Sequence, residues 1–289
     1  MQSDVIQWFP GHMAKTRRLI SENLKEVDII IEILDARIPY SSKNPEIAKI
    51  VGDKPTLTIL NKASLADKSA TQKWIEYYEK QGKSAISVDC ISGEGISLIS
   101  SAVKRILSEK LQKYEAKGMS KKLRAMFVGI PNVGKSSLIN KICGSKKAKV
   151  ENRPGVTLNK QWVPTNIGFD LMDMPGVLWP KFEEKVVGEN LAITGAIKDA
   201  ILDTEYIAVI LCSRLKNLAP DLFMTRYKIN KDELDLCETD YDIFELVGRK
   251  RGFLISGGEI NTERTAATLL EEFRSAKIGN ITLEMPRED

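Results

Sequence analysis

The sequence predicts an α/β domain built on a parallel sheet, followed by a smaller all-helical domain. The chain has 289 residues, whereas a single domain has about 150. In the first half, apolar strand-like runs alternate with helical stretches, which is the pattern of a parallel α/β sheet. From about Lys181 onward strand signals thin out and helical periodicity dominates. Pro175, Gly176 and Pro180 interrupt the pattern, so we expect one domain over 1–180 and another over 181–289.

The expected elements follow from the period of the apolar residues. Short apolar runs bounded by polar or turn residues predict strands, at 27–34, 56–60, 85–88, 123–129 and 169–172, with a more polar strand at 160–164. Amphipathic stretches with helical spacing predict helices, at 69–81, 96–114, 190–202, 241–250 and 262–275. Gly257 and Gly258 form a break before the last helix, which starts near Thr262.

Composition excludes several classes of protein. Hydrophobic residues make up 43% and charged residues 28%, which is ordinary for a globular chain. No apolar run reaches the roughly 18 residues of a membrane span, and the first residues have no apolar signal core. The four cysteines form no CxxC pair, and the chain has one histidine, so zinc ribbons and disulfide scaffolds are not expected. We therefore expect a cytoplasmic protein without a membrane partner.

Charge is distributed unevenly along the chain. Residues 1–176 contain 28 Lys and Arg against 18 Asp and Glu, whereas residues 177–289 contain 15 against 21. The basic excess concentrates in 104–124 and 141–153. A basic half suits a polyanion such as RNA, and a solvated helix face with a linker explains the same charges equally well.

A phosphate-binding loop is the strongest motif. Gly129-Ile-Pro-Asn-Val-Gly134-Lys135-Ser136 fits GxxxxGK[ST] and follows an apolar strand. Its glycines let backbone N–H groups converge on phosphate oxygens. We expect Lys135 to contact the β- and γ-phosphates and the Ser136 hydroxyl to hold Mg²⁺.

Two further segments complete the expected phosphate site. An apolar strand ends in Asp173-Met-Pro-Gly176, a DxxG motif, whose acid reaches Mg²⁺ through water and whose glycine amide meets the γ-phosphate. Between the two motifs, Arg153-Pro-Gly-Val-Thr157 offers a hydroxyl for Mg²⁺ and is a switch I candidate.

The expected base-reading residues lie upstream of the phosphate loop. No NKxD follows the DxxG motif, but the strand at 56–60 ends in Asn61-Lys62-Ala63-Ser64. The strand at 85–88 ends in Asp89-Cys90, which suits a backbone contact with the base oxygen. This order, base loops before phosphate loop and switches, is a circular permutation of the usual GTPase order.

At this point the chain resembles a known family. It is similar to the circularly permuted GTPases of the ribosome biogenesis GTPase A (YlqF) family. The matching segments, which span nearly the whole chain, are 6–15 (IQWFPGHMAK), 35–39 (DARIP), Asn61-Lys62, 131–137 (PNVGKSS), 154–157 (PGVT), 173–176 (DMPG) and the tail 257–286.

The resemblance implies a GTPase that acts late in assembly of the large (50S) ribosomal subunit. It implies hydrolysis stimulated by the particle, release afterwards, partners in the subunit and its rRNA, and GTP or GDP with Mg²⁺ as ligands. DNA is not an expected partner, and we expect a monomer. The nucleotide contacts it implies are Asn61, Lys62, Ala63, Ser64, Asp89, Cys90, Asn132, Val133, Gly134, Lys135, Ser136, Ser137, Thr157 and Gly176, with Ser136, Thr157 and Asp173 at the metal.

One departure from the family concerns the base. The family reads guanine with an Asp where this chain has Ser64. A carboxylate accepts two hydrogen bonds from guanine, whereas a hydroxyl satisfies at most one well. A P-loop NTPase of relaxed base specificity is therefore an alternative. Asp67 lies three residues further on, at a spacing that does not suit compensation.

Hydrolysis requires a group to orient water, and the position after DxxG is Val177, which cannot hydrogen-bond. The resemblance offers His12, because a neutral imidazole orients water or accepts its proton. The alternative is that His12 belongs to an RNA-docking segment with Trp8, Phe9 and Lys15. Asn132 resembles the asparagine that coordinates potassium in cation-activated GTPases.

The helical tail carries weaker signals. Arg249-Lys250-Arg251 suits an rRNA contact, and a capped helix end explains the same run. The apolar positions Leu269, Leu270 and Phe273 fit a core. An alternative function for the whole chain is a nucleotide-gated rRNA-docking module in which turnover is incidental.

Overall fold

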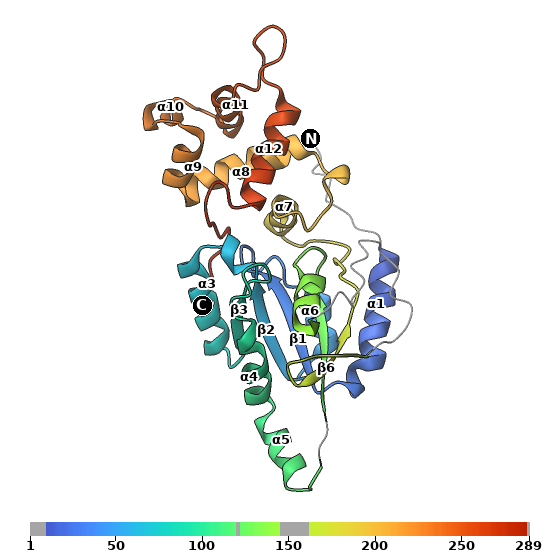
Figure 1. Ribbon diagram of the computed structural model, residues 1–289. Helices are drawn as coiled ribbons and strands as arrows, with labels where there is room; N and C mark the ends of the chain where they lie inside the picture. Colours follow the sequence, from blue (N-terminus) through green and yellow to red (C-terminus); the bar gives the residue numbers. More distant parts are fainter. Residues whose placement is uncertain (1–9, 120–121, 145–161, 288–289) are drawn as a thin grey trace. The chain divides into compact units, whose positions relative to one another are not determined.

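The computed structural model describes residues 10–119, 122–144 and 162–287 of the chain (Figure 1). The chain divides into two compact units. The first contains Met1–Glu183 and Glu284–Asp289, and the second contains Glu184–Leu283. The division falls three residues after the boundary at 180, and the chain from Glu284 groups with the first unit, which the sequence did not indicate.

A six-stranded sheet forms the first unit. Its order is β3-β2-β1-β4-β6-β5, and every pair is parallel except β5 with β6. This confirms the predicted α/β class. The strands are β1 (Ile29–Asp35), β2 (Thr56–Asn61), β3 (Ser84–Val88), β4 (Leu123–Gly129), β5 (Trp162–Pro164) and β6 (Phe169–Asp173).

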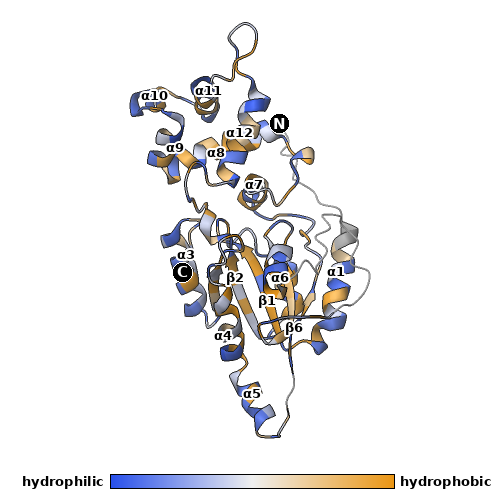
Figure 2. Ribbon diagram, viewed as in Figure 1, coloured by the Kyte–Doolittle hydropathy of each residue, from blue (hydrophilic) through white to orange (hydrophobic). Residues whose placement is uncertain are grey.

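The central strands are apolar because helices cover both faces of the sheet. All seven residues of β1, Ile-Ile-Ile-Glu-Ile-Leu-Asp, are buried, and β4 is buried at six of seven positions. Figure 2 shows β1 and β2 as mainly hydrophobic. Strands of this kind are near-continuous hydrophobic runs rather than alternating ones, which is why the sequence revealed them.

The first unit also contains α1 (Pro10–Asn23), α2 (Pro45–Val51), α3 (Lys68–Lys80), α4 (Ile96–Ile106), α5 (Ser108–Glu115) and α6 (Lys135–Cys143). Ile20 of α1 and Ile47 of α2 share one core cluster with Ile30 of β1. Trp74 of α3 packs in another with Leu60 of β2. These helices cover the sheet and leave its carboxyl edge to the loops.

The helix predicted over 96–114 is wrong as a single element. Leu107 leaves helical geometry at φ −99° and ψ 16° while its side chain stays 3% exposed. The helical run therefore divides at Leu107 into α4 and α5. Helix α5 has no buried residue, so its periodicity carried no information about the break.

The described part of the second unit is helical, with one isolated bridge between Leu254 and Ile260. Its helices are α7 (Lys185–Ile193), α8 (Thr204–Leu218), α9 (Pro220–Tyr227), α10 (Lys231–Asp235), α11 (Asp240–Lys250) and α12 (Thr262–Arg274). Leu211 and Leu215 of α8 share one core with Phe244 of α11 and Phe273 of α12. Leu269 and Leu270 lie in the same core, as predicted.

The helix predicted over 190–202 is also wrong. Helix α7 ends at Ile193, and Gly195 adopts φ +78°, a left-handed conformation that glycine reaches without strain. Arg274 then binds the freed end of the helix, because its Nε and one Nη donate to the carbonyls of Ile193 and Ala192, both at 2.9 Å. A short 3-10 turn at Asp199–Ile201 replaces the predicted last turns.

Candidate nucleotide-binding site

The predicted base and phosphate motifs lie at the carboxyl edge of the parallel strands. Asp35 at the end of β1 is in register with Asn61 of β2, and Asn61 with Val88 of β3. Gly129, the last residue of β4, is in register with Ile33. Ligands of open α/β sheets bind outside this edge. The sheet therefore brings together loops that lie far apart in the sequence.

The phosphate loop runs from Gly129 to the start of α6 at Lys135. Asn132 has φ 61° and Gly134 has φ 88°, both in the left-handed region. A Cβ on Gly134 would lie 2.4 Å from Asn61 Nδ2, so only glycine fits there. Successive turns of this kind point backbone N–H groups to one side, which is how such a loop binds anions.

Lys135 and Asp173 form an ion pair at this loop. Lys135 Nζ contacts Asp173 Oδ1, and the lysine is buried. Asp173 is the last residue of β6, which pairs in parallel with β4. The structure thus joins the expected phosphate lysine to the expected metal-binding acid.

The residues present fit a hydrated Mg²⁺. Ser136, on the first turn of α6, and Asp173, at the end of β6, carry oxygen atoms of the kind that Mg²⁺ prefers, and Mg²⁺ sites keep several waters. Among the described residues, no group of three or more His, Cys, Asp or Glu forms a cluster able to hold a metal ion by itself.

The DxxG glycine packs against the phosphate loop. A Cβ on Gly176 would lie 3.1 Å from Pro131 N and 3.2 Å from the Ile130 carbonyl oxygen. The absence of a side chain lets the two backbones approach. Asn44 then holds the next residue, because its Nδ2 donates to the Val177 carbonyl at 3.1 Å. Sequence reasoning missed Asn44, since only the fold places it there.

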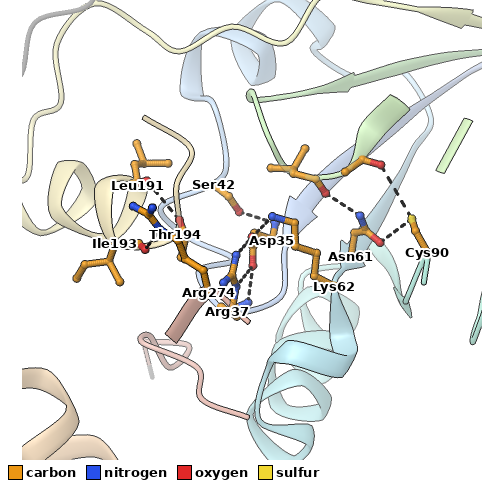
Figure 3. A network of polar contacts seen from close by, with 12 residues as sticks. Asp35, Arg37, Ser42, Asn61, Lys62, Cys90, Leu191, Ile193, Thr194 and Arg274 are labelled. Atoms are coloured by element: carbon orange, nitrogen blue, oxygen red, sulfur yellow. Dashed lines mark hydrogen bonds and ion pairs between the residues drawn. The ribbon is translucent and has the colours of Figure 1, made fainter. Parts of the chain in front are cut away.

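Asn61 joins the base loop to the phosphate loop (Figure 3). Its Nδ2 donates to the Val133 carbonyl at 2.6 Å, and the thiol of Cys90 donates to its Oδ1 at 3.1 Å. Burial raises the pKa of Cys90 to about 11, so the thiol stays protonated and remains a donor. One side chain thereby connects the ends of β2, β3 and β4.

Lys62 is held by a buried network at the end of β1. Its Nζ donates to Asp35 Oδ2 at 3.0 Å, and Arg37 donates to both carboxylate oxygens, at 2.9 and 2.7 Å (Figure 3). Burial alone would raise the pKa of Asp35, but the charges of Arg37 and Lys62 outweigh it and hold that pKa well below its usual range. Sequence reasoning quoted the DARIP segment only for its resemblance and did not assign it this role.

Ser64 and Asp89 meet in the same region. The Ser64 hydroxyl donates to Asp89 Oδ2, and Asp89 is buried. Asp67 instead caps α3, where its Oδ1 accepts the Ala70 N–H at 2.7 Å. Ala63 and Ser64 belong to a short 3-10 turn that follows Lys62.

Several expected residues lie elsewhere or outside the described part. Trp8, Phe9 and Thr157 are outside the described residues, as is the side chain of His12, whose backbone belongs to α1. Lys15 is exposed on α1, and Ser137 is exposed on α6.

The three basic residues at the end of α11 each contact an acid. Arg249 pairs with Glu245 at 2.8 Å and Lys250 with Glu233 at 2.6 Å. Arg251 binds Glu272 and stacks 5.1 Å from the centre of the Tyr227 ring. These contacts give Arg251 a structural role within the second unit.

Comparison with known proteins identifies the family. The model of the 50S ribosome-binding GTPase family matches residues 124–247. Ribosome biogenesis GTPase A of Priestia megaterium is 46% identical, over 98% of both chains. The Bacillus cereus protein of that name is 45% identical, over 98% of this chain and 95% of that one.

The chain belongs to the ribosome biogenesis GTPase A family. It is a GTP hydrolase that binds GTP and GDP. The GDP-bound structure of YlqF from Thermotoga maritima is 27% identical with a TM-score of 0.63, covering 94% of this chain and all of that one. None of the described helices of this GTPase has the length and apolar character needed to cross a membrane.

Proposed function

We propose that this GTPase binds the immature large ribosomal subunit and promotes a late step in its assembly. The particle stimulates hydrolysis, and hydrolysis drives release. The observation that carries the proposal is the meeting of Asn61, Lys62, Lys135 and Asp173 at one sheet edge, in a chain whose relatives are named Ribosome biogenesis GTPase A. In this proposal the protein acts in the cytoplasm as a monomer.

The proposal includes a circularly permuted GTPase domain over 1–180. The base loops after β2 and β3 precede the phosphate loop and the DxxG motif in sequence, yet β1 and β2 lie beside β4 in the sheet. A chain that began at β4 and continued past a joined terminus into β1 would have the usual motif order. The helical part over 181–289 is then the rRNA-binding domain.

The proposed nucleotide contacts follow the motif order. Asn61 and Lys62 hold the base, Gly134 and Lys135 hold the phosphates, and Ser136 with Asp173 would hold Mg²⁺. That ion, when bound, neutralises charge on the β- and γ-phosphate oxygens. The remaining proposed contacts are Ala63, Ser64, Val133, Ser137, Thr157 and Gly176, together with Asp89 and Cys90 through their backbone.

Asn132 supports a potassium requirement. It is exposed at the turn of the phosphate loop with φ 61°, and its amide oxygen suits a monovalent cation that neutralises developing charge. Asn132→Gly tolerates this backbone conformation and removes the oxygen. We expect the variant to turn over equally in potassium and sodium at matched ionic strength, whereas the parent turns over faster in potassium.

Val177 cannot orient water, so the proposed catalytic group is His12. Steady-state GTP hydrolysis in potassium buffer, with and without purified large subunits, tests the assembly role. We expect slow turnover that rises many-fold with the subunits, and His12→Ala to lose that rise while keeping subunit binding. Loss of subunit binding by His12→Ala would assign the segment of Trp8, Phe9 and Lys15 to docking instead.

Exposed basic residues of the second unit provide the matched test of rRNA contact. Arg249 and Lys250 are exposed, and their replacement by Gln should weaken subunit binding and make that binding less dependent on salt concentration. Arg251→Gln should destabilise the unit, because its guanidinium binds Glu272. Tight subunit binding by the parent chain, with turnover that the subunits leave unchanged, would refute particle-stimulated hydrolysis and favour a docking module.

A further inference from the structure

We propose that Asp89 is a positioning residue that makes Ser64 an obligate hydrogen-bond acceptor for the guanine base. The hydroxyl of Ser64 then performs the reading that the family assigns to a carboxylate at that position. The inference rests on the guanine nucleotide proposed for this site and names the residues that select it. It concerns base selection and is independent of any ribosomal partner.

The contacts fix which way the Ser64 proton points. The hydroxyl donates to Asp89 Oδ2, and the Ser64 backbone N–H approaches the same oxygen at 3.3 Å. The other oxygen, Oδ1, accepts from the backbone N–H groups of Ile91 at 2.9 Å and Ser92 at 2.8 Å. Four donors therefore converge on one carboxylate, and it cannot rotate without losing several of them.

Asp89 and Ser64 differ in their exposure to solvent. Asp89 is 1% exposed, whereas Ser64 is exposed. Burial alone would raise the pKa of Asp89, but hydrogen bonds from the Ser64 hydroxyl and the Ser92 amide lower it, so the carboxylate stays ionised. Ser64 is therefore the member of the pair that lies at the surface, while the charge of Asp89 stays within the protein.

A hydroxyl has one proton and two acceptor positions. Because the Ser64 proton is directed at Asp89, any hydrogen bond between a base and this oxygen must be donated by the base. Guanine offers donors at N1 and at its exocyclic amine. Adenine has an acceptor at N1, and xanthine has a carbonyl in place of the amine. The arrangement therefore favours guanine over adenine and xanthine. Hypoxanthine lacks the amine, so its affinity should lie between that of guanine and that of the other two bases.

The fold explains why these two residues meet although they are 25 positions apart in sequence. Strands β2 and β3 are parallel, with Asn61 in register with Val88. The residues that follow these strands leave the sheet at the same edge. Asp67, the acid nearest to Ser64 in sequence, accepts the Ala70 N–H as the cap of α3, so it is engaged in starting that helix.

Competition against fluorescently labelled GDP, with the full chain and no ribosomal particles, tests the assignment. The competitors are GDP, IDP, XDP and ADP. We expect the parent chain to bind GDP most tightly and IDP next. In Asp89→Asn the amide oxygen is held at the position of Oδ1 by the backbone N–H groups of Ile91 and Ser92, so the NH₂ group faces Ser64. The Ser64 proton then loses its acceptor and can turn toward a carbonyl. Its preference for GDP over XDP should fall about tenfold, the upper range for one lost hydrogen bond between uncharged groups.

Glu94→Gln is the matched control. It makes the same change from carboxylate to amide in the same loop, at an exposed side chain, and should leave the ratio of GDP to XDP affinity unchanged. Binding of inorganic pyrophosphate, measured for every variant, reports an intact phosphate loop. A variant that keeps pyrophosphate binding but changes base preference has lost base reading and not the fold.

An exchange of the two residues gives the second arm. Ser64→Asp alone places two carboxylates side by side, so GDP affinity should fall. Adding Asp89→Ser restores one carboxylate and one hydroxyl, and GDP affinity should recover about tenfold relative to the single variant. The proposal is overturned if Asp89→Asn keeps the parent preference while Ser64→Ala loses it, or if the parent itself binds XDP as well as GDP.

These outcomes are separable from failure of the assembly role. A parent chain that selects GDP through Asp89 but shows no turnover with large subunits would refute the assembly proposal and leave this assignment intact. Turnover that rises with subunits, together with an Asp89→Asn variant of unchanged base preference, would do the reverse.

Discussion

Replacing Asp35 by Asn should destabilise the first unit strongly. The Asp35 side chain is 3% exposed and that of Arg37 is 2% exposed. The carboxylate accepts hydrogen bonds from the Arg37 backbone N–H, from two of its guanidinium nitrogens and from Lys62 Nζ. An amide of the same shape turns an NH₂ group toward these donors and leaves a buried guanidinium without its counter-charge. Removing one partner of a buried pair costs about 3–5 kcal/mol.

Glu32 on the same strand provides the matched control. It is buried at 7% exposure, and burial raises its pKa, with Lys43 and Lys83 opposing that rise. Folding therefore disfavours its charged form, whereas the partners of Asp35 favour the charged form there. Glu32→Gln makes the same isosteric change and should leave the free energy of unfolding unchanged or slightly higher at neutral pH.

Urea unfolding followed by tryptophan fluorescence is the suitable assay. The tryptophans at 8, 74, 162 and 179 all belong to the first unit, so their signal reports that unit alone. We expect the urea midpoint of Asp35→Asn to be clearly lower than that of the parent. The midpoint of Glu32→Gln should not be lower than that of the parent. Nucleotide affinity should fall with Asp35→Asn as well, because the carboxylate holds Lys62 beside the base loop.

The pH dependence has opposite signs at the two positions. The pKa of Asp35 is lower in the folded state than its unfolded value of about 3.9. Its stabilisation is present above that value and is lost as pH falls through the folded pKa. The difference between parent and Asp35→Asn should therefore shrink below about pH 4. As pH falls through the raised pKa of Glu32, the free energy of unfolding of the parent should increase relative to that of Glu32→Gln. Equal effects of both substitutions at neutral pH would refute this account.

Three further substitutions, the first with a matched control, test the roles of individual residues. Gly134→Ala places a Cβ 2.4 Å from Asn61 Nδ2 and should lower nucleotide affinity about tenfold or more, by about the 1.4 kcal/mol that a broken contact of this kind represents. Gly52→Ala also has a positive φ but meets nothing within 4 Å, so calorimetric titration with GDP should show no change. Asn44→Ser retains a cap for α2 but loses the amide donor to the carbonyl after the DxxG motif; GTP turnover should change while the melting temperature stays within a few degrees, and unchanged turnover would count against the tether. Glu272→Gln removes a carboxylate that binds two guanidinium groups and a tyrosine hydroxyl; circular dichroism should show unfolding at lower urea with GDP affinity preserved, and a parent-like midpoint would contradict this role.

Local patterns predicted the sheet and the phosphate loop because both depend on residues close in sequence. A continuous apolar run such as β1 is buried on both faces wherever it lies in a parallel sheet. The phosphate loop is similarly self-contained, since Gly134 and Lys135 act through the strand before them and the helix after them. The predicted strand limits therefore differ from the observed ones by a residue or two.

Helix limits were less predictable because packing decides them. The helical run at 96–114 divides at Leu107, whose side chain is buried. Gly195 ends α7 early, and the carbonyls that this exposes are bound by Arg274, about 80 residues away in sequence. Neither feature changes the spacing of the apolar residues. The spacing therefore predicted a continuous helix across each of these positions.

The base site shows the limit of motif reading most clearly. A motif treats Ser64 as the loss of a carboxylate, because it compares one position with one expected residue. The sheet places Asp89 behind that serine through the register of β2 and β3, so a carboxylate is present at the site although the motif lacks it. In the same way, Asp35 at the end of β1 accepts a hydrogen bond from Lys62, which follows β2. In both cases the charge that acts on a base-loop residue comes from the neighbouring strand. In the arrangement that we propose, base selection depends on paired strand ends, and single substitutions within Asn61–Ser64 should be interpreted together with their partners at 35 and 89.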